Sequence, residues 1–475
     1  MKYLFLLLLL ASFNAHSQTP KEKMLEGVSK KEMYYGGIAK QIWTFAEVSF
    51  QEAKSSNLLQ DILRKEGFKI ESRVAGIPTA FVATFGDGKP IISILGEYDA
   101  LPGLSQDSTT EKKSVSGIAG HACGHHLFGV GSVAAVIAVK EYMKTNNIKG
   151  TLRFYGTPAE EDGDGKVYLV RAGLFNDVDV VLHWHPWSQN HANPYNTLAY
   201  KAVKFRFYGI ASHASAAPES GRSALDAVEA MDYMVNMMRE HVPPETRIHY
   251  VITNGGKAPN VVPDFAEVYY YYRHPRREIL MDIADRIEKA AQGAALGTGT
   301  KVEMETVGGT YELLPNETLA KVMHKNLSTV GGVKYSTEEK LFAEKISKTL
   351  LIAAIKYEDA EIIQPITLGT FGGGSTDVGD ISWVVPTVAV RTATWVPGTP
   401  AHSWQAVAAG GMSIGRKGMI NAAKTLALTA IDLFENPQLI KDATAEFEKA
   451  RGGKDYQYKS LLGDRKPPLE QEKIN

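Results

Sequence analysis

Apolar and polar positions follow two different periods along this chain. Between residues 30 and 66 apolar side chains recur three and four positions apart, as at Ile42, Ala46 and Phe50, which predicts helix. Further helices are predicted at 128–143 and 166–172. Short apolar runs typical of buried strands occur at 81–85, 90–95, 151–155 and 179–183. Because strands and helices alternate, we expect an α/β sandwich.

A different order of elements occupies residues 197–315. Strand, helix, strand, strand, helix and strand are predicted there at 200–208, 222–241, 249–253, 267–273, 278–296 and 301–307. This β-α-β-β-α-β order is the split ferredoxin-like pattern. After it the α/β signals return, with a strand at 384–391 and a long helix at 413–433.

These two patterns predict the domain organisation. A ferredoxin-like α+β lid at 197–315 is inserted into a discontinuous catalytic α/β domain formed by 18–196 and 316–440. The remaining residues, 441–475, are polar and contain Gly452-Gly453 and Pro467-Pro468. We expect this tail to be ordered only where it docks on the surface.

The first seventeen residues have the composition of a secretory signal. Lys2 precedes a largely apolar run of 11 residues, 3–13, and Ala15 and Ser17 supply small residues before a cleavage point. The run is too short to span a hydrocarbon core of about 30 Å. We therefore expect residues 1–17 to be a cleaved signal peptide, the mature protein to be periplasmic or secreted, and no membrane attachment to remain after cleavage.

Charge and cysteine content narrow the class of function. Lys plus Arg total 52 and Asp plus Glu total 53, so the net charge is −1. A chain this close to neutral has no general attraction for nucleic acid or anionic lipid. Cys123 is the single cysteine, so it cannot form an internal disulfide. It is a buried thiol, a metal ligand, a nucleophile or an intermolecular bridge.

Four short clusters carry the residue types that bind metals. They are 121–126 (HACGHH), 158–162 (PAEED), 183–186 (HWHP) and 399–404 (TPAHSW). Thiolate, imidazole and carboxylate together suit zinc, or manganese or cobalt at a carboxylate-rich position. Five such ligands exceed what one tetrahedral ion needs, so we expect two divalent ions. Paired ions about 3.5–4 Å apart activate water and polarise a carbonyl.

Seven motifs then occur in a recognisable order. They are 96–102 (GEYDALP), 120–126 (GHACGHH), 158–161 (PAEE), 183–186 (HWHP), 209–227 (GIASHASAAPESGRSALDA), 259–263 (PNVVP) and 398–404 (GTPAHSW). Across roughly residues 30–435 the chain resembles the amidohydrolase branch of the dinuclear metallo-aminoacylase/carboxypeptidase superfamily. The resemblance implies a catalytic α/β domain with an inserted lid that also makes a dimer contact.

The resemblance also implies roles for individual residues. The implied metal ligands are Cys123, His125, Glu161, His185 and His402. Glu160 resembles the general base, Asp99 the residue that orients a ligand, and His213 a group that reaches across a dimer to the oxyanion. Asn260 and Arg273 resemble the groups that hold a substrate carboxylate. His183 is a second choice for the ligand assigned to His185.

The sequence thus predicts an exported, metal-dependent amidohydrolase or peptidase. Its expected substrates are N-acyl or N-aroyl amino acids, aminobenzoyl-glutamate-like conjugates among them, or small peptides. We expect a homodimer, and the resemblance leaves room for a related second subunit. Two alternatives remain open: a hydrolase with Cys123 as nucleophile and His125 or His126 as its base, and a binding protein without turnover that uses the same cleft.

Overall fold

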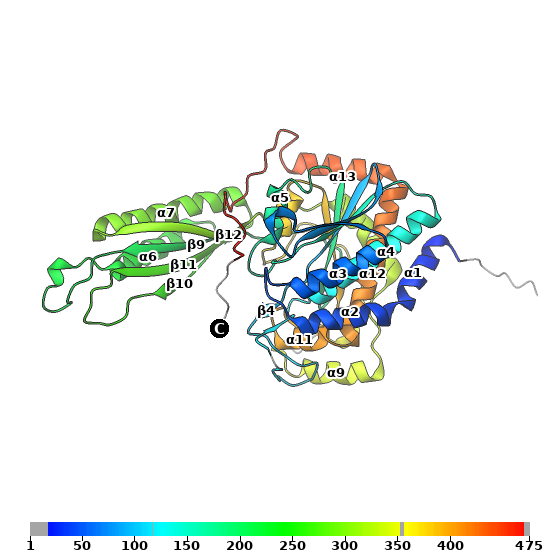
Figure 1. Ribbon diagram of the computed structural model, residues 1–475, viewed down its shortest axis with the longest axis horizontal. Helices are drawn as coiled ribbons and strands as arrows, with labels where there is room; N and C mark the ends of the chain where they lie inside the picture. Colours follow the sequence, from blue (N-terminus) through cyan, green and yellow to red (C-terminus); the bar gives the residue numbers. More distant parts are fainter. Residues whose placement is uncertain (1–17, 116, 352–355, 470–475) are drawn as a thin grey trace, which may run out of the picture.

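A six-stranded sheet forms the centre of the larger of two domains (Figure 1). The computed structural model describes residues 18–115, 117–351 and 356–469, so the predicted signal peptide lies outside the described residues. Across the sheet the strands are β1 (Lys69–Ser72), β2 (Phe81–Asp87), β6 (Gly150–Gly156), β3 (Ile91–Gly96), β7 (Val180–Trp187) and β14 (Thr387–Ala393). The last four run parallel, so their carboxyl ends meet at one edge.

Helices enclose this sheet, as expected for parallel strands buried on both faces. They are α1 (Pro20–Lys30), α2 (Glu32–Phe45), α3 (Ala53–Lys65), α4 (His125–Thr145), α5 (Gly165–Arg171), α8 (Glu317–Val330), α9 (Thr337–Ser347), α10 (Val378–Ser382), α11 (Trp404–Gly410), α12 (Ser413–Glu435) and α13 (Pro437–Ala450). Helices α4 and α12 pack on each other and on β3 and β7. By length and composition α4 could cross a membrane, but 94% of its apolar window is buried, so core packing explains its hydropathy.

The smaller domain is a four-stranded antiparallel sheet with two helices, and it projects to the left of the catalytic domain in Figure 1. Its strands, in spatial order, are β10 (Arg247–Asn254), β11 (Phe265–His274), β9 (Ala199–Tyr208) and β12 (Lys301–Thr310), with helices α6 (Ala224–Met238) and α7 (Arg277–Thr298) packed on it. This is the ferredoxin-like order, and the predicted fold class is confirmed.

Strand β11 illustrates how the lid sheet separates its two faces. Its residues alternate strictly between buried and half-buried positions. Tyr270 and Tyr272 are fully buried in the lid core, whereas Tyr269 and Tyr271 lie on the opposite face. The run of four tyrosines is therefore half core and half open sheet face, as the period of two requires.

Some predicted boundaries differ from the structure. The helix expected across 30–66 is broken, because Ala46 and Phe50 adopt positive φ angles of 43° and 63°. Helices α8 and α9 were not predicted. Helix α13 extends across residue 440, where the polar tail was expected to begin. Beyond α13 the chain returns to the junction of the two domains, where the Tyr458 hydroxyl donates to Asp380 Oδ1 at 2.6 Å.

The central sheet makes a direct stability prediction. Phe154 on β6 is fully buried and contacts Phe81, with 5.5 Å between ring centroids. Phe154→Ala should lower the free energy of unfolding by about 3–5 kcal/mol, because it leaves a cavity in a packed core. Urea unfolding of the purified protein measures the change. Met33→Ala, at a position 69% exposed, should stay within about 0.5 kcal/mol of the parent.

Candidate metal centre and active site

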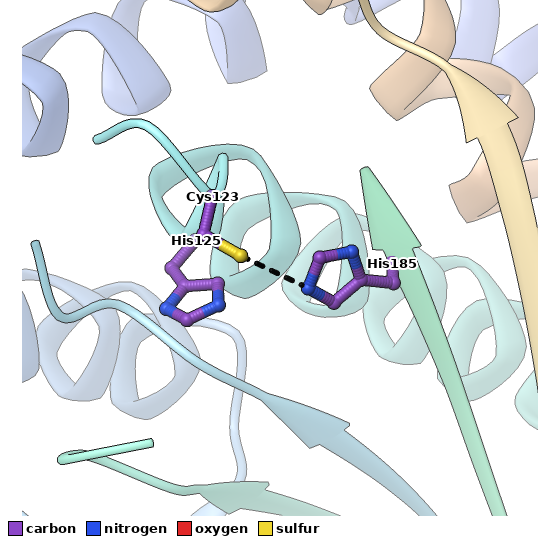
Figure 2. A group of neighbouring side chains, drawn as sticks. All are labelled: Cys123, His125 and His185. Atoms are coloured by element: carbon purple, nitrogen blue, oxygen red, sulfur yellow. Dashed lines mark hydrogen bonds between the residues drawn. The ribbon is translucent and has the colours of Figure 1, made fainter. Parts of the chain in front are cut away.

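The residues implied as metal ligands come from loops at the carboxyl edge of the parallel strands. Cys123 lies in a turn and His125 is the first residue of α4, while His185 lies near the end of β7 (Figure 2). Gly124 between the first two has a φ of 79°, and a Cβ there would lie 2.6 Å from Cβ of Pro186. Glycine therefore lets the turn approach β7 closely enough to join the two ligand sets.

Two groups of ligand atoms share the thiol of Cys123. In the first, Cys123 Sγ lies 3.5 Å from His185 Nε2, and His125 completes the trio (Figure 2). In the second, the thiol lies with Glu161 and His402, whose Oε2 and Nε2 atoms are 3.3 Å apart. Within each group all ligand atoms are within 4.8 Å of one another. The structure thus brings together all five residues that the resemblance implies.

His125 is clamped between two buried carboxylates. Its Nδ1 lies 2.8 Å from Asp99 Oδ1, and its Nε2 lies 3.0 Å from Glu97 Oε2. Asp99 Oδ2 also accepts the backbone N–H of Glu161 at 2.9 Å. Burial lowers the pKa of His125, but Glu97, Cys123 and Asp99 outweigh it, and the pKa lies well above its ordinary value. Asp99 therefore orients one predicted ligand and anchors the loop of another, as expected of such a partner.

A buried ion network beneath the site was not found in the sequence. Lys166 is fully buried, and its Nζ lies 2.6 Å from Glu97 Oε1 and 2.7 Å from Asp377 Oδ1. Burial opposes the charge on Glu97, but Lys166 and His125 hold its pKa below the ordinary range. Glu97 stands inside the 96–102 motif, and Asp377 in a glycine-rich segment, so only their order along the chain was visible beforehand.

Glu160, implied as the general base, lies beside this network. Its Oε2 is 4.0 Å from His125 Nε2. Burial raises the pKa of Glu160 well above its usual range, and the carboxylates of Glu97 and Glu161 add to the effect. The loop that carries it depends on Glu52, whose Oε1 accepts the Ala159 N–H at 2.9 Å. Glu52 is a second positioning residue that no sequence motif indicated.

The unpartnered atoms in this cluster fit a cation. Glu97 Oε2, His125 Nε2 and Glu161 Oε1 are buried and make no hydrogen bond to the described residues. A buried acceptor without a partner costs free energy, so such atoms mark a place for an ion or a proton. Because thiol, imidazole and carboxylate converge here, the donor set suits zinc, manganese or cobalt.

A cavity of about 420 Å³ opens beside the cluster, between the two domains. The catalytic domain contributes the predicted ligands Cys123, Glu161, His185 and His402, together with Glu160, His183 and Arg391. The lid contributes Tyr200, Tyr271 and Arg273. His183, the second choice for a ligand, is 3% exposed, and neither of its ring nitrogens has a partner among the described residues. Arg273, predicted to hold a carboxylate, therefore lies where a substrate would bind.

His213 and Asn260 lie elsewhere. They stand side by side on exposed loops of the lid, where the Ala214 N–H donates to Asn260 O at 3.0 Å. Neither lines the cavity of its own chain. The structure therefore does not bring these two predicted residues to the metal ligands within one protomer.

Comparison with known proteins places this geometry in a family. Residues 199–298 match the peptidase dimerisation domain. One of the subunits of p-aminobenzoyl-glutamate hydrolase from Escherichia coli (strain K12) is 40% identical over 460 residues, which cover 91% of this chain and 95% of the relative. The chain belongs to the M20 family of peptidases and amidohydrolases. It is accordingly an enzyme that hydrolyses amide bonds.

Two further members set the range of the M20 family around this chain. Xaa-Arg dipeptidase from Mus musculus is 31% identical over 90% of this chain and 92% of the relative. A solved structure from Bacillus subtilis, described as a dinuclear metal-binding peptidase of the M20 family, superposes with a TM-score of 0.57 at 17% identity, over 86% of this chain and 99% of that one. The solved structure supports the fold.

The convergence of ligands predicts how metal content responds to substitution. His185→Ala should lower bound divalent metal from about two ions per chain toward one, because removing one ligand weakens a site. Plasma mass spectrometry of the purified protein measures this. His249→Ala, on the exposed face of the lid, is the matched control and should leave the metal content unchanged. Equal metal in both variants would contradict the assignment of His185.

Proposed function

We propose that this M20 protein is an exported, dinuclear metal-dependent amidohydrolase that releases an amino acid from N-acyl or N-aroyl conjugates or small peptides. The observation that carries the proposal is the meeting of five ligand side chains with Glu160 at one cavity. The E. coli relative, named for aminobenzoyl-glutamate hydrolysis, supports conjugates of that kind as substrates. The signal-like composition of residues 1–17 supports export to the periplasm or medium.

In this proposal Cys123, His125, Glu161, His185 and His402 hold two divalent cations, with zinc or manganese favoured and cobalt acceptable. Such cations, when bound, supply Lewis-acid chemistry that polarises an amide carbonyl and acidifies water. Asp99 fixes the ring of His125 through its 2.8 Å contact with Nδ1, leaving Nε2 directed at the cluster. This arrangement sets the tautomer that a ligand nitrogen requires.

Glu160 performs the proton transfers. Its carboxylate takes a proton from the attacking water and delivers it to the departing amide nitrogen. Burial and neighbouring carboxylates raise its pKa, which suits a group that must both accept and return a proton near neutral pH. Arg273, on the lid side of the cavity, binds the carboxylate of the amino-acid part.

His213 supplies a donor to the partner protomer. Its Nδ1 accepts the backbone N–H groups of Ser215 and Ala216 at 3.3 and 3.2 Å. Because Nδ1 is an acceptor, the ring proton of the neutral imidazole resides on Nε2, which is then free to donate to an oxyanion. Its distance from its own cavity supports a role across a homodimer. The E. coli relative is named as one of two kinds of subunit, which also favours testing for a related second subunit here.

The cysteine-nucleophile alternative is disfavoured. Burial raises the pKa of the Cys123 thiol well above its ordinary value, and Glu161 raises it further. A protonated thiol is a poor nucleophile, and a raised pKa is the opposite of what such catalysis requires. The alternative also leaves Glu161 and His402 without a function. A binding protein without turnover would not need Glu160 beside the ligand set.

Glu160→Gln tests the chemistry. Metal-loaded parent protein should release an amino acid from at least one of aminobenzoyl-glutamate, acyl amino acids and dipeptides, and a chelator should abolish the release. Glu160→Gln should retain both ions but lose about 10²–10⁴-fold in kcat, because the amide cannot accept the proton. Amino-acid release and metal content are measured on the same samples.

Two outcomes would contradict this assignment. Loss of metal in Glu160→Gln would mean that Glu160 and Glu161 have exchanged roles. Hydrolysis that survives the chelator would instead favour Cys123 as nucleophile, which an alkylating agent would then inactivate.

A mixing experiment tests His213. His213→Ala and Glu160→Gln should each be inactive alone while remaining folded. When the two variants are mixed and allowed to exchange subunits, about half of the dimers are mixed and each regains one working site, so activity should return to about a quarter of the parent level. Circular dichroism controls for folding. Activity that does not return on mixing would show that His213 does not act across a dimer.

A further inference from the structure

Arg391 is a cavity residue to which neither the sequence motifs nor the proposed mechanism gives a role. It lies on β14, directly beside His185 of β7 in the parallel register, so both side chains emerge on the same face at the carboxyl edge. Its backbone N–H and C=O are both bonded to His191, at 2.8 and 3.0 Å. The strand therefore fixes Arg391 next to a predicted metal ligand, where it lines the cavity.

Two aromatic rings hold the guanidinium of Arg391. Its Cζ lies 4.1 Å from the ring centroid of Trp187 and 4.4 Å from that of Tyr195. Both rings also line the cavity. A planar guanidinium held by stacking keeps its in-plane N–H groups available for a planar, bidentate partner such as a carboxylate.

Arg391 has no such partner within the protein. Its buried Nε makes no hydrogen bond, and no carboxylate oxygen of the described residues lies within 4.0 Å of its nitrogens. The groups that face it are His183, His185 and His191, and burial lowers the pKa of each to about 3, so all three are neutral. The positive charge of Arg391 is therefore uncompensated at close range.

The carboxylates of the same cavity have other partners. Glu97 and Asp377 share Lys166, Glu161 lies against His402, and Asp164 accepts the Tyr200 hydroxyl at 2.6 Å. Arg277, a stacked arginine outside the cavity, lies 3.5 Å above Trp383 and is also paired, with Glu278 and Glu312. A half-buried charge without a counter-ion is costly, and such a charge in a cavity is suited to a ligand.

We propose that Arg391 binds a second carboxylate of the substrate, in addition to the one held by Arg273. This inference rests on the proposed function and narrows its substrate class to conjugates that carry two carboxylates. Arg273 is likewise free of any carboxylate partner among the described residues and lies over Tyr200 and Tyr271, so the cavity presents two stacked guanidiniums from two domains. The second carboxylate is either on the side chain of the released amino acid or on the acyl group.

The charge of Arg391 also selects against one class of substrate. A conjugate whose released amino acid has a cationic side chain would place like charges together in a half-buried cavity. Preference for a basic residue, as the name of the Xaa-Arg dipeptidase relative implies for that protein, would be inconsistent with this arrangement.

Matched substrates measure the effect. One pair is 4-aminobenzoyl-glutamate and 4-aminobenzoyl-glutamine, which differ in the side-chain carboxylate. The other is 4-carboxybenzoyl-alanine and 4-carbamoylbenzoyl-alanine, which differ in the acyl group. We expect kcat/KM of the parent protein to favour the acid in one pair by about tenfold or more, and that pair locates the second carboxylate. Equal rates within both pairs would overturn the proposal.

Variants then assign the preference to Arg391. Arg391→Gln should reduce the acid-to-amide ratio of kcat/KM by about tenfold or more, mainly through KM, and Arg391→Lys should restore part of it, because lysine keeps the charge but not the bidentate geometry. Arg451→Gln is the matched control: Arg451 stacks on Phe447 at 4.5 Å with a buried, unpartnered Nε, but lies outside the cavity. A purely structural role would lower both rates of a pair equally and leave the ratio unchanged, which would overturn the proposal.

A binding measurement separates this inference from the proposed function. N-(4-aminobenzyl)-glutamate and its glutamine counterpart have no amide carbonyl at the reacting position, so both resist hydrolysis. If 4-aminobenzoyl-glutamate is the preferred acid, calorimetry on metal-loaded protein should show tighter binding of the glutamate analogue, and Arg391→Gln should remove the difference. Selective binding without turnover of any substrate would reject the hydrolase while supporting Arg391. Turnover with equal binding of the two analogues would do the reverse.

Discussion

The buried contact of Lys166 with Glu97 and Asp377 is the constraint on which the rest of the site depends. It joins three separated segments, the loop after β3, the start of α5 and the start of α10. Each charge would be costly in this interior if its partner were removed. Because Lys166 occupies one oxygen of Glu97, the other is left facing His125, which Asp99 holds from the opposite side. The central histidine is thus fixed by two acids that are themselves anchored.

The division into two domains gives the site its second property. Predicted metal ligands and Glu160 come from the catalytic domain, while Arg273 and Tyr271 come from the lid. The position of the lid therefore sets the distance between the reacting carbonyl and a bound carboxylate. Such positioning is a large part of catalysis, because correct placement of reactants removes much of the entropic barrier. His213 extends the same logic to a second copy of the chain.

Local sequence patterns were sufficient for the order of the elements. The ferredoxin-like lid follows from six alternating segments whose periods are unambiguous, and the parallel strands follow from apolar runs such as 90–95. Helical periodicity failed where backbone conformation overrides it, because Ala46 keeps the apolar spacing but adopts a left-handed conformation that ends α2. Motifs selected the five candidate ligands, which the fold then brought to one cavity.

The sequence by itself determined the fold class and which residue types could serve a dinuclear centre, because both are written in short-range patterns and motif order. Tertiary structure alone decided what surrounds them. Lys166 pairs with Asp377, 211 positions away, and Arg391 comes beside His185 only through the pairing of β14 with β7. Burial, missing counter-ions and shifted pKa values arise from packing between distant segments, and no local pattern records them.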